Sequence, residues 1–70
     1  MMNLDVIREN SSAVYSVLKS AYSCTFNELQ RFTQLGSTEL CLAIAQLLRD
    51  CKIQQQKSGG GIYYQVANGI

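Results

Sequence analysis

The sequence has no histidine, and only 16% of its 70 residues are charged. Histidine is the commonest acid–base catalyst. The sequence also lacks a nucleophile elbow, a phosphate-binding loop and a paired-carboxylate arrangement. We therefore expect that the chain is not an enzyme. The low charge, together with 47% hydrophobic residues, is the opposite of the composition of disordered segments, so we expect the chain to fold.

Closely spaced cysteines are also missing. The three cysteines, Cys24, Cys41 and Cys51, lie far apart, whereas zinc and iron–sulfur sites are usually built on Cys-x-x-Cys pairs. With no histidine to complete a ligand set, we expect no metal site and no cofactor unless two copies pool their cysteines. An odd number of cysteines without an export signal argues against structural disulfides. We expect these side chains to be buried or half-buried as small apolar residues.

No apolar run approaches the ~20 residues of a membrane span. The first ten residues contain no cationic stretch ahead of an apolar run, as a secretory signal would. We therefore expect a soluble, cytoplasmic protein with no membrane partner. The sequence has no internal repeat and no linker, so residues 1–70 are expected to form a single domain. A core of this size stabilises a fold by roughly 3–5 kcal/mol, and dimerisation would enlarge it.

Helical periodicity is present from residue 4 to about residue 21. Asn3 is a suitable N-cap, and Ser11 falls on the same stripe as the apolar residues. Val6, Ala13 and Val17 lie beside this stripe, which makes the apolar sector wider than one small core requires. Either a second copy covers the excess, or Val17 packs on the hairpin or the tail. The main stripe consists of Leu4, Ile7, Val14, Leu18 and Ala21.

A second helix is predicted from near Phe26. Thr25 and Glu28 form a capping box, in which each side chain bonds the backbone N–H of the other residue. The inner face of this helix is predicted to carry Phe26, Leu29 and Phe32.

A third helix is predicted after the breaker Gly36, running to about Cys51. Leu35 precedes the breaker and is expected to anchor the short turn between the second and third helices. Such a short turn favours the sharp crossing of a helix-turn-helix. The residues that repeat with helical period in this segment are Leu40, Ala43, Ile44, Leu47, Leu48 and Cys51.

The C-terminal part of the sequence changes to an extended pattern. Two β-prone runs, 53–57 and 62–66, flank a glycine cluster at 59–61, and glycine supplies the positive φ angles that a hairpin turn requires. A lone hairpin is marginally stable in water. We therefore expect it to pack on the helices through Ile53 and alternate members of the set Ile62, Tyr63, Tyr64 and Val66.

The run ELQRFTQLGSTELCLAIAQLLRDCKI, followed by a glycine-tipped hairpin, resembles the winged helix-turn-helix regulators. It resembles most the small single-domain winged-helix proteins of uncharacterised function from bacteria such as Bacteroides. The resemblance implies an α+β fold of three helices and a two-stranded wing, with residues 22–24 as a short strand that pairs with the hairpin. The matching positions are packing positions, so they specify a fold and leave function open. They are Glu28, Leu29, Leu35, Leu40, Ala43, Ile44, Leu47 and Ile53.

The resemblance also implies binding to double-stranded DNA and transcriptional regulation, with the third helix in the major groove and the hairpin on the adjacent backbone. Two features oppose this hypothesis: Leu42 and Ala45 make the centre of the reading face apolar, and Glu39 lies where a phosphate would approach. With a net charge of +1, one chain offers few cations for the 6–10 phosphate contacts of a typical site, and a homodimer would double them. The candidate DNA-binding residues are Thr38, Gln46, Arg49, Lys52 and Lys57.

The alternative hypothesis is a protein-interaction module that packs the third helix against a partner protein or a second copy. Its candidate surface consists of Cys41, Leu42, Ala45, Val6 and Val17. A third hypothesis makes Cys41 or Cys24 a redox-sensitive thiol, although no paired resolving cysteine is evident.

Overall fold

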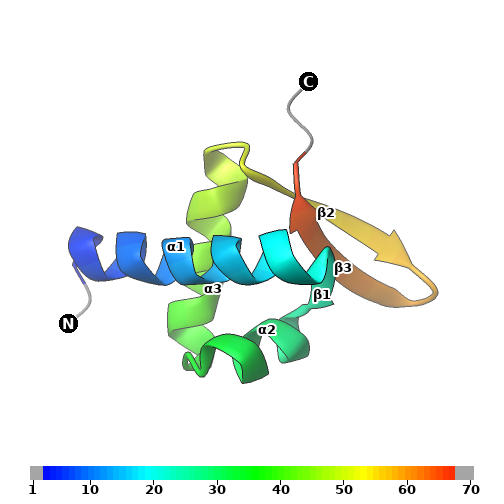
Figure 1. Cartoon of the computed structure of the whole chain (residues 1–70), viewed down its shortest axis with the longest axis horizontal. Helices are drawn as coiled ribbons and strands as arrows, with labels where there is room; N and C mark the ends of the chain where they lie inside the picture. The colour runs from blue at the N-terminus through cyan, green and yellow to red at the C-terminus, as the bar shows by residue number, and fades with distance from the viewer. Residues whose placement is uncertain (1–2, 68–70) are drawn as a thin grey trace.

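The computed structural model describes residues 3–67, and its helices and strands follow the predicted order (Figure 1). The fold is the α+β winged helix that the sequence predicted. Residues 1–2 and 68–70 of the expected single domain lie outside the described residues. The elements are α1 (Leu4–Ala21), β1 (Ser23–Thr25), α2 (Phe26–Thr33), α3 (Ser37–Arg49), β2 (Ile53–Ser58) and β3 (Gly61–Val66).

Helix α1 begins where its predicted cap lies. The Asn3 side chain accepts the N–H of Val6 at 3.0 Å, which satisfies one of the free donors of the first turn. Ser11 is buried on the inner stripe, and its hydroxyl donates to the carbonyl of Ile7 at 2.8 Å. The prediction for Leu4 is wrong: it is 68% exposed, because the first turn of α1 extends beyond α3 and has nothing to pack on (Figure 1).

Helix α2 has the predicted capping box. The Thr25 hydroxyl accepts the N–H of Glu28 at 3.2 Å, and the Glu28 carboxylate accepts the N–H of Thr25 at 2.9 Å. Leu29 is fully buried, Phe26 packs partly against the core, and Leu35 is half-buried beyond the helix end. The prediction for Phe32 is wrong, since this ring is 60% exposed.

Helix α3 buries the predicted residues Leu40, Ala43, Ile44 and Leu47, but it ends at Arg49 rather than near Cys51. At the end of α3, the N–H of Lys52 donates to the carbonyl of Leu47 at 2.9 Å. The N–H of Cys51 donates to the carbonyl of Leu48 at 3.1 Å. These two bonds form a Schellman motif, which places Cys51 in the left-handed region at φ 59°. The turn removes Cys51 from the helical stripe that predicted its packing.

The sheet is antiparallel, and β3 lies between β1 and β2. The predicted short strand is present one residue later than expected, at Ser23–Thr25. Gly59 and Gly60 have φ angles of 57° and 84° and form the turn of the wing. Of the alternating hairpin residues, Tyr64 and Val66 pack against the core, whereas Ile62 and Tyr63 are exposed.

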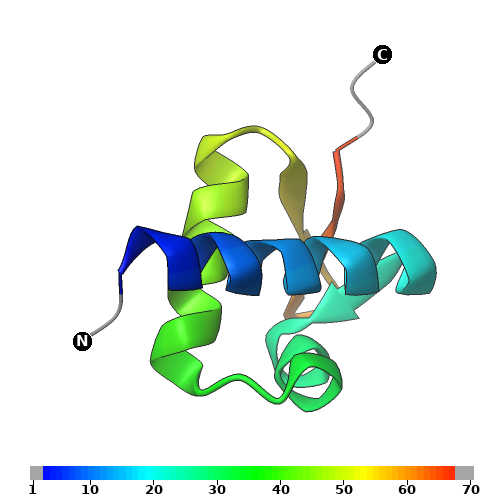
Figure 2. The same ribbon diagram turned by 60° about the vertical axis from the view of Figure 1, so that its left-hand side comes forward.

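The core lies where α1 crosses α3 and where one face of the sheet covers the helices, as Figures 1 and 2 show together. Cys24 is buried there as a small apolar residue, as predicted, but Cys41 and Cys51 are exposed. Cys41 lies on the solvent side of α3, and Cys51 lies in the turn that follows this helix. No helix within residues 3–67 combines the length and apolarity needed to cross a membrane. The buried apolar residues are Val14, Leu18, Cys24, Leu29, Leu40, Ala43, Ile44, Leu47 and Ile53.

Candidate nucleic-acid interface

The solvent face of α3 carries most of the predicted reading residues. Thr38, Leu42, Ala45 and Arg49 are all exposed, because successive residues of a helix turn by 100° and these four lie opposite the buried side of α3. Leu42, at the centre of this face, is 39% exposed. The face is therefore part apolar and part polar, as the sequence suggested.

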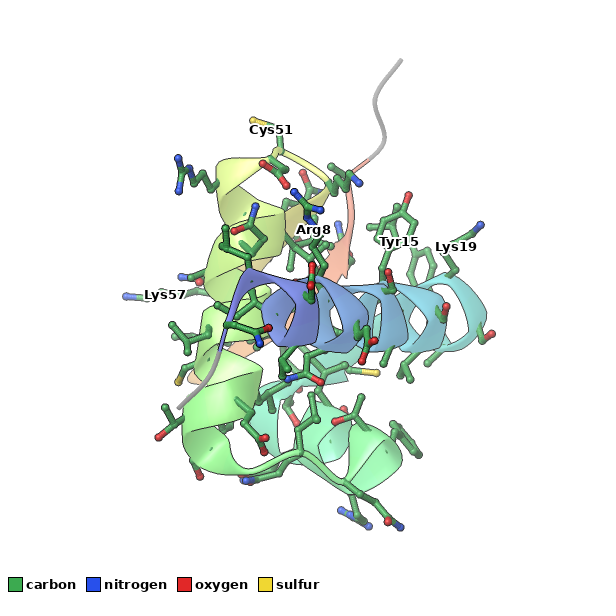
Figure 3. The ribbon with its side chains drawn as sticks, turned by 90° about the vertical axis from the view of Figure 1, so that its left-hand side faces the viewer. Arg8, Tyr15, Lys19, Cys51 and Lys57 are labelled. Atoms are coloured by element: carbon green, nitrogen blue, oxygen red, sulfur yellow. The ribbon has the colours of Figure 1, made fainter. Side chains whose placement is uncertain are left out.

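Lys57 lies on the same side of the molecule as the solvent face of α3. Strand β2 is buried only at Ile53, so the rest of the strand extends beyond the helices as a free wing (Figure 1). Lys57 pairs with Ile62 near the glycine turn. Figure 3 shows its side chain projecting past α3 on the side away from α1. The solvent face of α3 and the Lys57 ammonium are thus both accessible from the side of the molecule opposite α1.

Gln46 and Lys52 lie on a different flank. Gln46 is half-buried, and its side-chain N–H donates to the Asp50 carboxylate at 3.0 Å. Lys52 lines a groove between α1 and the end of α3, together with Arg8, Tyr15 and Asp50. The five predicted DNA-binding residues therefore form two groups: Thr38, Arg49 and Lys57 in one, and Gln46 and Lys52 in the other.

Helix α1 has a separate basic flank that the sequence analysis did not identify. Arg8, Tyr15 and Lys19 point to the same side of the helix (Figure 3), and the Lys19 ammonium lies 5.7 Å from the centre of the Tyr15 ring. The spacing of seven and four residues predicts this shared side. However, only the tertiary structure brings Lys52 beside Arg8.

The cations and the carboxylates differ in their partners. Within residues 3–67, no lysine or arginine nitrogen lies within 4.0 Å of a carboxylate oxygen. By contrast, Glu28 and Glu39 accept backbone N–H groups at the starts of α2 and α3. The Glu39 carboxylate thus bonds to Gly36, one turn back along α3. The described lysine and arginine side chains therefore have no carboxylate partner, and the ammonium of Lys19 lies over the Tyr15 ring.

The residues of the alternative interaction surface also lie in two groups, on different helices. Cys41, Leu42 and Ala45 are exposed on α3, whereas Val6 and Val17 are half-buried on α1. Val17 packs partly against the core.

The environment of Cys24 disfavours a redox role. Burial, and to a lesser extent the negative charge of Glu28, raises the pKa of the Cys24 thiol, so the reactive thiolate is disfavoured.

Sequence comparison agrees with this architecture. A family model described as a winged helix-turn-helix domain (DUF2582) matches residues 2–66. No curated protein matches the chain.

Proposed function

The chain belongs to the winged helix-turn-helix domain family DUF2582, and from this premise we propose that it binds double-stranded DNA as a cytoplasmic regulator of transcription. One observation carries the proposal: Arg49 is exposed on the side of α3 opposite its buried residues, Lys57 of the wing projects past α3 on the side away from α1 (Figure 3), and both cations are free of carboxylate partners. In winged-helix binding, α3 lies in the major groove and the wing lies along the neighbouring backbone.

Each residue of this surface has a distinct role in the proposal. Lys57 contacts a backbone phosphate from the wing, and the Thr38 hydroxyl bonds a phosphate near the start of α3, where the helix dipole favours anions. Arg49 contacts a base edge or a phosphate. Leu42 and Ala45 give apolar contacts of the kind that thymine methyl groups accept. Lys52 and Gln46 add contacts at the edge of the interface.

The number of cations favours a homodimer on DNA. Arg49, Lys52 and Lys57 are exposed in the second half of the chain, and Arg31 is exposed on α2. A site with 6–10 phosphate contacts needs more cations than these four. Two copies provide twice as many and match a two-fold symmetric DNA site.

The proposal is tested by measuring affinity for random duplex DNA across a range of salt concentrations. Arg49→Ala and Lys57→Ala should each weaken binding and lower the salt slope by about one unit. Lys19→Ala is the matched control, because Lys19 is an exposed cation on α1 that does not belong to the group of Thr38, Arg49 and Lys57 to which the proposal assigns the DNA contacts. Its salt slope should equal that of the wild type. Absence of binding at low salt would contradict the proposal.

A second candidate function is protein binding through the solvent face of α3. The observation in its favour is the exposure of Leu42 between Cys41 and Ala45, at the centre of a face with few charges. Leu42→Glu would then abolish partner capture. If protein capture is abolished by Leu42→Glu and no DNA binding is found at low salt, this function replaces the first.

A further inference from the structure

The groove between α1 and the end of α3 has a volume of about 390 Å³. This lies within the range of small-ligand sites, roughly 300–1,000 Å³. The groove joins side chains that are far apart in the sequence, and Figure 3 shows Arg8 and Tyr15 on one side of α1. We call it the α1–α3 groove and define it by Arg8, Ser12, Tyr15, Gln46, Asp50 and Lys52, with the buried residue Leu47 also in its lining.

Hydrogen bonds hold the walls of the α1–α3 groove in place. The buried Ser11 hydroxyl, which donates within α1, also lies 3.4 Å from the Ala43 carbonyl of α3. The N–H of Lys52 donates to the Leu47 carbonyl at 2.9 Å, and the Lys52 carbonyl accepts the N–H of Ala67 at 2.9 Å. The backbone on both sides of the groove is therefore fixed before any ligand binds, which lowers the cost of binding.

The α1–α3 groove holds charges of both signs that do not pair with each other. Arg8 and Lys52 are cations, Asp50 is an anion, and all three side chains are exposed. Within residues 3–67, no lysine or arginine nitrogen lies within 4.0 Å of a carboxylate oxygen. The Asp50 carboxylate instead accepts a side-chain N–H of Gln46 at 3.0 Å. This amide orients the carboxylate without neutralising it, and a carboxylate has room for further donors.

We propose that the α1–α3 groove binds a small zwitterion of the α-amino-acid type. The ligand carboxylate lies between the Arg8 guanidinium and the Lys52 ammonium, and the ligand ammonium donates to the Asp50 carboxylate. A guanidinium matches a carboxylate because it presents parallel N–H donors. The side chain of the ligand packs along the Tyr15 ring.

The mixture of charges selects this class of ligand. A plain anion such as phosphate is attracted by Arg8 and Lys52 but repelled by Asp50, and a plain cation meets the opposite signs. A neutral ligand leaves all three charges without partners. Only a ligand that carries both signs pairs with all of them. The groove shares Lys52 with the edge of the proposed DNA interface, but the inference does not rest on DNA binding.

The test is an amide NMR titration of the isotope-labelled full chain with three probes at neutral pH. L-phenylalanine carries both charges, phenethylamine lacks the carboxylate, and hydrocinnamate lacks the ammonium. All three share a phenyl ring, so they differ in charge alone. L-phenylalanine should bind with a Kd of about 1 mM, because the paired charges stay partly in water. The other two probes should each bind about five-fold more weakly.

Two variants separate the roles of the charges. Asp50→Asn keeps an oxygen that accepts the Gln46 amide, so the fold should be retained. It should weaken L-phenylalanine by about five-fold and strengthen hydrocinnamate, because the repulsion is removed. Arg8→Gln should weaken both of these probes by about five-fold. A purely structural role of Asp50 would weaken all three probes alike.

Glu9→Gln and Arg31→Gln are the matched controls. Each removes one charge from an exposed position outside the groove, and each should bind the three probes as the wild type does. All four variants should keep the wild-type circular dichroism spectrum. The comparison of the three probes on the wild type needs no variant, so it tests the proposal even if a variant fails to fold.

Three results would overturn the proposal. The first is no amide shift with L-phenylalanine up to about 20 mM. The second is tighter binding of hydrocinnamate or inorganic phosphate than of L-phenylalanine, which would make the groove a plain anion site. The third is a set of shifted amides that lies away from Arg8, Tyr15 and Lys52. The titration contains no DNA, so its failure leaves the proposed function standing, and the salt-slope experiment can fail without affecting this site.

Discussion

The Glu39 carboxylate accepts the backbone N–H of Gly36 at 2.9 Å. Gly36 is the N-cap of α3 and has no side chain to satisfy the free donors of the first turn, so Glu39 provides half of a capping box from within the helix. The same bond keeps a negative charge at the start of α3, where a DNA phosphate would approach. Glu39 thus stabilises the helix and opposes the proposed function.

Glu39→Gln separates these two effects. Glutamine at this position also satisfies the N-cap donor, so the free energy of unfolding should change by less than about 0.5 kcal/mol, while DNA affinity rises a few-fold at low salt because the repulsion is removed. Glu39→Ala removes the bond and should lower the unfolding free energy by about 1 kcal/mol. Thermal melts and fluorescence anisotropy measure the two effects. Equal DNA affinity for Glu39→Gln and the wild type would show that this charge does not face DNA.

The sequence predicted those parts of the fold that depend on contacts between neighbouring residues. The Thr25–Glu28 capping box is a local arrangement, and it was predicted correctly. Phe32 shows where spacing alone fails: positions three apart turn by 300°, so Phe26, Leu29 and Phe32 move steadily around the helix. Thr33, four residues after Leu29, lies closer to Leu29 around the helix than Phe32 does, and Thr33 rather than Phe32 is half-buried.

The candidate site was predictable only in part. Arg49 is exposed opposite the buried stripe of α3, as its phase in the helix required. The partner of Gln46 is Asp50, four residues further along α3, so helical spacing alone allows this bond. The neighbours of Lys52 depend on how α1 crosses α3, and helical periodicity contains no information about that crossing. The sequence therefore placed both residues beside the reading face, without the groove that they line together with α1.

Asn10 gives a prediction about stability. Its side-chain nitrogen is buried without a hydrogen-bond partner, which costs about 1–3 kcal/mol. Asn10→Ala removes this donor and also raises helix propensity, so the unfolding free energy should rise by about 1 kcal/mol. Asn27→Ala, at an exposed position of α2, is the control for propensity. Urea unfolding curves should show a larger gain for Asn10→Ala, and equal gains would mean that the buried donor has no cost.

Cys24 gives a prediction about pH. Burial, and then the Glu28 charge, raises the thiol pKa in the folded state, so folding favours the protonated form. The resulting stability is complete below the unfolded-state pKa of about 8.5 and is lost as pH rises through the higher folded-state pKa. The difference in unfolding free energy between the wild type and Cys24→Ala should therefore fall above about pH 8.5. Tyrosine and lysine titrations are common to both proteins and cancel, so a difference independent of pH would contradict the assignment.

Cys51 gives the last prediction, because it is a residue with a Cβ atom in the left-handed position of a Schellman motif, with φ 59°. Glycine is usual at this position, since other residues have a steric cost there of roughly 1–2 kcal/mol. Cys51 is exposed and its thiol is free, so Cys51→Gly loses no packing and should raise the unfolding free energy by about 1 kcal/mol, or the Tm by about 4–8 °C. Cys51→Ala keeps the Cβ atom and should leave the Tm unchanged. If the alanine variant gained as much as the glycine variant, loss of the thiol rather than relief of backbone strain would account for the effect.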